Sequence, residues 1–161
     1  MTVLQNKMLH IILLTAVTFL IYANSLQNDF TNWDDQELII NNARIKSLSA
    51  KNIFDIFTSP TGADYLPFKE ISYAIDYRIW KLNPFGYRLA NMVLYAGNVI
   101  LVYLIINFLF KDSVAALIAS ICFSAHPVHI ESVAWLSARK DVLSGVFFVA
   151  LLLAMRFSVN L

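Results

Sequence analysis

The stretch 89–110, LANMVLYAGNVILVYLIINFLF, contains no charged residue and is bracketed by Arg88 and Lys111. A helix needs about 20 largely apolar residues to cross the hydrocarbon core of a bilayer. The stretch has that length, and it therefore predicts a membrane-spanning helix. The number of similar stretches in the rest of the chain decides the fold class.

Three further apolar runs occur in the chain, at 8–26, 113–126 and 142–158. We therefore predict an all-α membrane protein with four transmembrane helices and a single transmembrane module over residues 1–161. The first run could instead be a cleaved signal peptide, because ANS at 23–25 is a weak cleavage pattern. Its length and the three runs that follow favour an uncleaved anchor.

The composition agrees with a membrane protein. Hydrophobic residues make up 58% of the chain, and charged residues make up 14%, against about 25% in soluble domains. The net charge of +1 provides no basic surface for a nucleic acid. Cys122 is the one cysteine of the sequence, so an intramolecular disulfide is excluded. We expect membrane lipid to be a partner and nucleic acid not to be one.

Two loops separate the predicted spans, a first loop at 27–88 and a second loop at 127–141. If Lys7 lies on the cytoplasmic side, both loops are extracytoplasmic. The distribution of basic residues does not decide the orientation, because the second loop carries Arg139 and Lys140. We therefore expect a multi-pass integral membrane protein with both loops on the extracytoplasmic or lumenal side.

The first loop is long enough to contain short amphipathic helices. One is predicted at 47–57, with Ser47 or Ser49 as its N-cap. A second is predicted at 68–82, where apolar residues recur every three or four positions. Such a helix lies in the membrane interface or packs on other protein, and the pattern fits both.

Two polar clusters lie in these loops: NWDDQE at 32–37 and HPVHIESVAWLSARKD at 126–141. Acids, imidazoles and cations at one membrane surface suit transfer from a lipid-linked phosphate donor. The leaving phosphate needs cations, and an acceptor hydroxyl needs a general base. Asp34 and Asp35 are the catalytic candidates, one as the base and one orienting the acceptor. The substrate-binding candidates are His126, His129, Glu131, Arg139 and Lys140.

Simpler structural roles are open for the same residues. The adjacent acids could form a solvated turn or a helix cap, and the two histidines could cap a helix end. We expect no zinc site, because neither a cysteine nor a third histidine lies near the pair. No cofactor is predicted. The alternative is Mg²⁺ or Mn²⁺ bound by the oxygens of Asp34, Asp35 and Glu131.

Three stretches of the chain, at 22–49, 73–95 and 126–148, resemble a known family when they are read in order. They read YANSLQNDFTNWDDQELIINNARIKSLS, YAIDYRIWKLNPFGYRLANMVLY and HPVHIESVAWLSARKDVLSGVFF. The family is that of the transmembrane and tetratricopeptide-repeat containing proteins, and the resemblance is to its N-terminal part. This family is similar to the protein O-mannosyltransferases of the GT-C glycosyltransferase superfamily.

The resemblance implies an inverting membrane glycosyltransferase with a GT-C-like fold. Its donor would be a polyprenyl-phosphate sugar, with mannose as the sugar, and its acceptors Ser or Thr hydroxyls of proteins. The acidic motif of the first loop would be Asp34-Asp35, and the second loop would carry the substrate-binding candidates. The chain departs from the family pattern at Leu66 and Tyr95, where many members have Arg and His.

The length of the chain predicts an N-terminal fragment, which would be inactive alone. Two non-enzymatic functions are alternatives. One is a non-catalytic membrane scaffold that binds a partner through the first loop. The other is half of a transporter, in which Asn91, Asn98 and Asn107 would hydrogen-bond between helices. Simple helix packing explains these asparagines as well.

Overall fold

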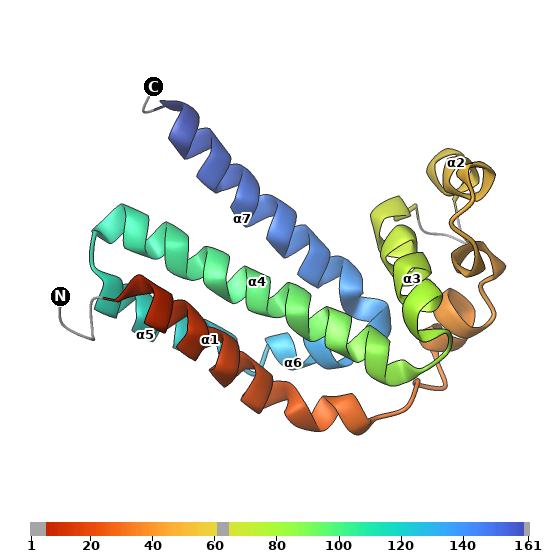
Figure 1. Cartoon of the computed structure of the whole chain (residues 1–161), viewed down its shortest axis with the longest axis horizontal. Coiled ribbons are helices and arrows are strands. Elements are labelled where there is room, and N and C mark those ends of the chain that lie inside the picture. Colours follow the sequence, from red (N-terminus) through yellow and green to blue (C-terminus); the bar gives the residue numbers. More distant parts are fainter. Residues whose placement is uncertain (1–5, 61–64, 160–161) are drawn as a thin grey trace.

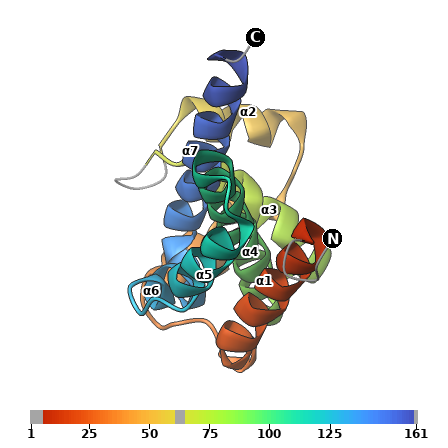
Figure 2. The ribbon, with the colours of Figure 1, turned by 90° about the vertical axis from the view of Figure 1, so that its left-hand side faces the viewer.

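The computed structural model describes residues 6–60 and 65–159, which are largely helical and contain no strand. The longest helix, α4 (Pro84–Phe110), lies at the centre and packs against three others (Figures 1 and 2). These are α1 (Lys7–Tyr22), which continues into the turn η2 (Ala23–Gln27), α5 (Ser113–Ser124) and α7 (Arg139–Val159). The all-α prediction is confirmed for the described residues.

Local sequence signals explain where α4 and α5 begin and end. Pro84 occupies the first turn of α4, and the Asn83 side chain accepts a hydrogen bond from the backbone N–H of Phe85. The helix ends at Lys111, whose φ of 56° is left-handed. Asp112 then caps α5 by accepting from Val114 and Ala115. The chain therefore reverses direction within two residues.

Two of the four predicted spans have the length and composition needed to cross a membrane, Lys7–Gln27 and Pro84–Phe110. The prediction at 113–126 corresponds to α5, which has 12 residues. At 1.5 Å per residue, α5 is about 18 Å long, well short of the roughly 30 Å of a bilayer core. The prediction at 142–158 falls within α7. The third and fourth spans stay predictions.

The first loop folds into short elements at one end of the long helices: η3 (Gln36–Ile40), η4 (Ala43–Lys46), α2 (Ala50–Thr58) and α3 (Pro67–Trp80). Of the two predicted N-caps, Ser49 is the one that caps α2, by accepting from the N–H of Asn52. In the second loop lie α6 (His129–Ala134) and η5 (Leu136–Ala138). The loops share a small core of Ile39, Ile45, Tyr73, Ala74, Tyr87 and Leu136.

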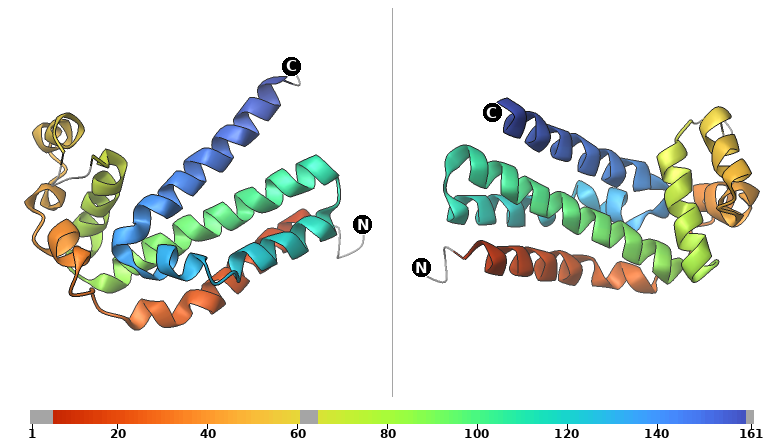
Figure 3. Two further views of the ribbon diagram at one scale, coloured as in Figure 1. Left: turned by 180° about the vertical axis from the view of Figure 1, so that it is seen from behind. Right: turned by 45° about the horizontal axis from the view of Figure 1, so that its top comes forward.

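The corner between α3 and α4 depends on a glycine. The Trp80 ring packs so closely on Gly86 that a Cβ there would lie 2.0 Å from it. Because of this corner, α3 runs across the end of α4 rather than beside it (Figure 3, right). At the same end, α7 starts close to α4 and then diverges along its length (Figure 1). The bundle is therefore closed where the loops meet and open at the other end.

Candidate functional site

Asp35 joins the two polar clusters directly. One carboxylate oxygen of this fully buried residue accepts from the backbone N–H and the hydroxyl of Ser137, at 3.1 and 2.5 Å. The other accepts from the N–H and the hydroxyl of Thr31, at 2.9 and 2.8 Å. The two clusters, about one hundred positions apart in the chain, therefore form one site.

The adjacent acids occupy different environments. Four hydrogen bonds engage both oxygens of Asp35, which leaves no free face toward a substrate. Asp34 is half-buried, and within residues 6–60 and 65–159 its carboxylate makes no hydrogen bond or ion pair. Within the described residues, Asp34 is therefore the acid of the pair whose carboxylate is not engaged, and Asp35 fixes its position.

Other residues reinforce the same junction. The Trp135 indole N–H donates to the Thr31 hydroxyl at 3.2 Å, and its ring lies 6.4 Å from that of Trp33, between centroids. The buried guanidinium of Arg88 donates to the backbone carbonyls of Asn28, Asp29 and Ala134. The start of α4 thus holds both loops in place.

Arg139, one of the substrate-binding candidates, is completely buried. Its guanidinium pairs with Asp76 of α3 at 2.5 Å and donates to Asn91 at 2.6 Å and to the Tyr87 carbonyl at 2.8 Å. It also lies 4.6 Å from the centre of the Tyr73 ring. Burial raises the pKa of Asp76, and the Arg139 charge opposes this shift. Arg139 therefore connects α3 to α4 and α7 and does not face solvent.

Lys140, the next residue, is exposed and lies at an apolar groove between α3 and α7. The groove has a volume of about 350 Å³ and is lined mainly by apolar side chains, among them Leu66, Pro67, Phe68, Leu143 and Phe147. A cation beside an apolar groove matches a ligand with a hydrocarbon part and a phosphate. Lys140 is thus the second-loop cation that remains accessible.

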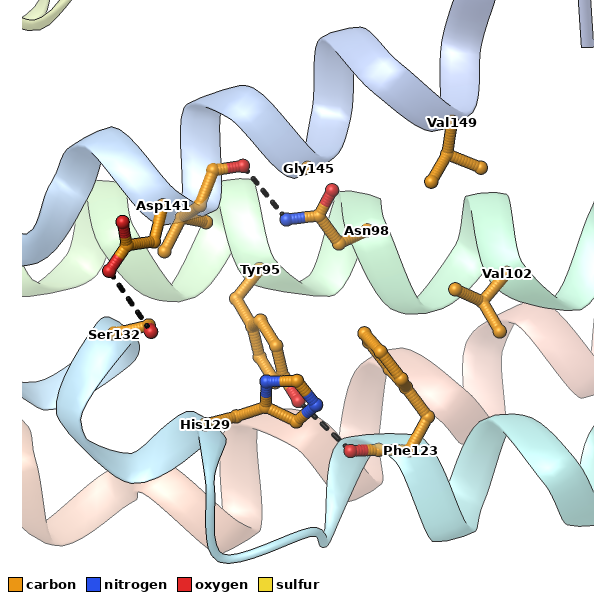
Figure 4. A pocket seen from close by; sticks show the side chains of 10 residues that line it. Tyr95, Asn98, Val102, Phe123, His129, Ser132, Asp141, Gly145 and Val149 are labelled. Carbon is orange, nitrogen blue, oxygen red and sulfur yellow. Dashed lines mark hydrogen bonds between the residues drawn. The ribbon is translucent and has the colours of Figure 1, made fainter. Parts of the chain in front are cut away.

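His129 lines a second cavity, of about 340 Å³, which lies between α4, α5, α6 and α7 (Figure 4). The His129 ring packs on Phe123, with 4.4 Å between ring centroids, and His126 lies 6.0 Å from His129. Ser132 and Asp141 lie at the same end of the cavity, with 3.4 Å between the Ser132 hydroxyl and the Asp141 carboxylate. Glu131 is exposed on α6.

The floor of this cavity is a close contact between α4 and α7. The Asn98 amide donates to the Val142 carbonyl at 2.9 Å, and a Cβ on Gly145 would lie 3.0 Å from the Asn98 oxygen. On the same face of α4, Asn91 donates to the Val133 carbonyl at 3.3 Å. Both asparagines therefore hold other segments against α4.

We expect the stability of the fold to fall as the pH drops below about 6.5. Burial, and to a lesser extent the neighbouring His126, lowers the pKa of His129 from its ordinary value of 6.5. The unfolded chain then binds a proton at a higher pH than the folded chain, so acidification favours unfolding. Thermal unfolding in detergent between pH 8 and about 5 measures this. His129→Phe should flatten the profile, and an unchanged slope in that variant would contradict the assignment.

The alternative metal site does not assemble from its proposed ligands. In the part of the chain that the structure describes, no group of three or more His, Cys, Asp or Glu side chains could hold a metal ion. The oxygens of Asp35 face hydrogen-bond donors, and Glu131 is exposed on α6. Asp34, Asp35 and Glu131 therefore do not fit a metal ion in this arrangement.

Sequence reasoning missed the residues that support or adjoin the candidate site residues: Thr31, Asp76, Arg88, Ser137 and Asp141. Thr31 and Ser137 carry no pattern that distinguishes them from other hydroxyl residues. Arg88 borders a span and reads as an ordinary flanking cation. The acids of α3 gave no signal, because they occupy the polar positions of an amphipathic pattern and their partners are distant in sequence.

The described residues thus form a helical protein with two helices long and apolar enough to cross a membrane, and its two loops meet at one end of the long helices (Figure 1). Among curated proteins, the chain is 32% identical over 152 residues to protein O-mannosyl-transferase TMTC3 of Homo sapiens, which covers 89% of this chain and 16% of that protein. Identity is 29% over 150 residues to Tmtc1 of Drosophila melanogaster, covering 88% of the chain and 17% of the relative. Identity to human TMTC1 is 27% over 159 residues, which covers 92% of this chain and 18% of that relative.

The resemblance deduced from the motifs is thereby confirmed: the chain is TMTC-like and corresponds to the N-terminal part of that family. It spans 16% to 18% of the length of these curated relatives. No family model matches the sequence. No solved structure matches it significantly.

Proposed function

We propose that the chain is the N-terminal part of a membrane glycosyltransferase, which moves a sugar from a polyprenyl-phosphate donor to Ser or Thr hydroxyls of proteins. The names of the relatives, which are protein O-mannosyl-transferases, support mannose as the sugar and a protein as the acceptor. The observation that carries the proposal is the joining of both polar clusters through Asp35 and Ser137. It puts an available carboxylate beside the loop that leads to Lys140.

The reaction is a single displacement. The acceptor hydroxyl oxygen attacks C1 of the sugar, the bond between C1 and the phosphate oxygen breaks, and the hydroxyl proton passes to Asp34. Polyprenyl phosphate leaves with the bonding electrons. Attack and departure on opposite sides of C1 invert the anomeric configuration. No metal ion is needed if cationic side chains meet the leaving phosphate.

The donor lies along the groove between α3 and α7. Its first prenyl units contact the apolar lining, and the Lys140 ammonium meets the phosphate at the mouth. Arg139 does not contact the donor in this arrangement, because its charge is already paired with Asp76. A separate cavity is lined by His129, Ser132 and Asp141, which are available to contact the acceptor protein.

Lys140→Ala should raise the KM for the donor by about 10- to 100-fold, because hydrogen bonds to charged groups contribute about 1.5–3 kcal/mol. The assay is sugar transfer by membranes that contain the chain at its full natural length, with the donor concentration varied. Lys140→Arg should retain most of the donor affinity.

Lys46→Ala is the matched control, since Lys46 is an exposed lysine of η4 with no place in the site. It should transfer sugar at the original rate. An unchanged donor KM in Lys140→Ala would contradict the proposed phosphate contact. A chelator tests the metal-independent form separately: loss of transfer that added Mg²⁺ or Mn²⁺ restores would refute it.

A further inference from the structure

The helix α3 turns its polar side inward and its apolar side outward. Three of its charged residues, Lys69, Glu70 and Asp76, are at most 6% exposed. In contrast, Phe68 is 60% exposed, and further apolar residues on α3 and just after it are exposed as well: Ile75 at 47%, Ile79 at 64% and Leu82 at 40%. This arrangement is the reverse of an amphipathic helix packed on a soluble core.

Specific contacts fix α3 in this orientation. Glu70 pairs with Arg44 at 3.2 Å, and Asp76 pairs with Arg139 at 2.5 Å. The Tyr73 hydroxyl donates to the Leu136 carbonyl at 2.7 Å. Rotation of α3 that buried its apolar side would break these pairs and leave charges without partners. The exposed apolar face is therefore a stable feature of the fold.

The apolar face of α3, defined as Phe68, Ile75, Ile79 and Leu82, continues onto neighbouring helices. The Phe68 ring contacts Phe57 of α2 and Phe147 of α7, with centroids 5.7 and 5.5 Å apart. At the other end of α3, Trp80 contacts Phe85 at the start of α4, with 5.7 Å between centroids. The face is thus continuous with α4, a helix long and apolar enough to cross a membrane.

The exposed charged residues of α3 and of its C-terminal end are basic. Because both acids of α3 are buried in ion pairs, its exposed charged residue is Arg78, and Lys81 follows directly at the helix end. Lys51 of α2 and Lys140 of α7 are also exposed. Basic side chains beside an apolar helix face complement anionic lipid headgroups.

We propose that the apolar face of α3 docks on the surface of an anionic bilayer. Its four apolar side chains enter the boundary between headgroups and acyl chains, and Arg78 and Lys81 contact lipid phosphates. The crosswise course of α3 at the end of α4 lays it along the membrane surface (Figure 3, right). The partner is the lipid surface, and the inference does not depend on sugar transfer.

The test uses the chain at its full natural length, reconstituted into vesicles after Cys122 and every cysteine outside residues 1–161 have been replaced by Ser. A single cysteine at Ile79 carries an environment-sensitive fluorophore, and a cysteine at Lys46 is the matched control. Lys46 belongs to η4, which packs against α3, and it is exposed. Vesicles contain phosphatidylcholine alone or mixed with phosphatidylglycerol. Quenching by nitroxide-labelled lipid reports membrane contact, and quenching by aqueous iodide reports exposure to water.

At Ile79 we expect quenching by nitroxide lipid and protection from iodide, more strongly with phosphatidylglycerol present. At Lys46 we expect the opposite pattern. Replacing both Arg78 and Lys81 by Glu should remove the gain that phosphatidylglycerol gives. Iodide quenching at Ile79 equal to that at Lys46 would overturn the proposal. Protection from both quenchers would overturn it too, because the face would then be covered by protein.

Discussion

Asp34→Asn should lower the rate of sugar transfer by about 10²–10⁴-fold, the usual contribution of a positioned general base. The amide cannot accept the proton of the acceptor hydroxyl. It keeps the size of the carboxylate, and Asp34 makes no hydrogen bond within residues 6–60 and 65–159 whose loss would disturb the fold. Initial rates with the chain at its full natural length measure this. Donor binding and the thermal unfolding midpoint should stay close to their original values.

Asp35→Asn is the informative comparison, because it is the same change at the adjacent residue. An amide group at position 35 would turn its NH₂ toward the donors of Ser137 or Thr31, which now face carboxylate oxygens. We therefore expect a lower unfolding midpoint, with activity lost through misplacement of Asp34. Transfer at the original rate in Asp34→Asn would show that this carboxylate is not the base.

Arg139→Ala should destabilise the fold by about 3–5 kcal/mol, because it leaves the buried Asp76 carboxylate without its partner. Asp76 is 6% exposed, and its Oδ2 lies 2.5 Å from the guanidinium. Unfolding followed in detergent measures the loss. Replacing both residues, as Arg139→Met with Asp76→Leu, should recover much of the stability, since it removes both buried charges.

Lys140→Ala serves as the matched control for Arg139→Ala. It removes a neighbouring cation that is exposed, so the free energy of unfolding should change by less than about 0.5 kcal/mol. If Arg139→Ala instead leaves stability unchanged and raises the KM for the donor, Arg139 contacts the phosphate, as expected from the sequence alone.

The sequence predicts the elements that depend on local signals. Long charge-free runs indicate α1 and α4, and Ser49 caps α2 as its position predicts. The apolar period of residues 68–82 marks α3. This period does not predict which side of α3 faces the protein. The orientation of α3 is set by the pairing of Asp76 with Arg139, 63 positions away in the chain.

The sequence predicts which two loops form the candidate site, but it does not predict what each residue in them does. Adjacent acids look equivalent in sequence, yet Asp35 finds Ser137 and Thr31 as partners and Asp34 does not. Adjacent cations look equivalent too, yet Arg139 is buried and Lys140 is exposed. Burial and partners decide a role, and both arise from tertiary contacts that one sequence does not display.

The most direct measurement of the proposed function is the anomeric configuration of the product. The chain at its full natural length is incubated with polyprenyl-phosphate mannose and a peptide that contains Ser and Thr, and the glycopeptide is analysed by nuclear magnetic resonance. We expect mannose on a hydroxyl oxygen, with the configuration at C1 opposite to that of the donor. Retained configuration, or no glycopeptide from a folded chain that binds the donor, would contradict a single displacement assisted by Asp34.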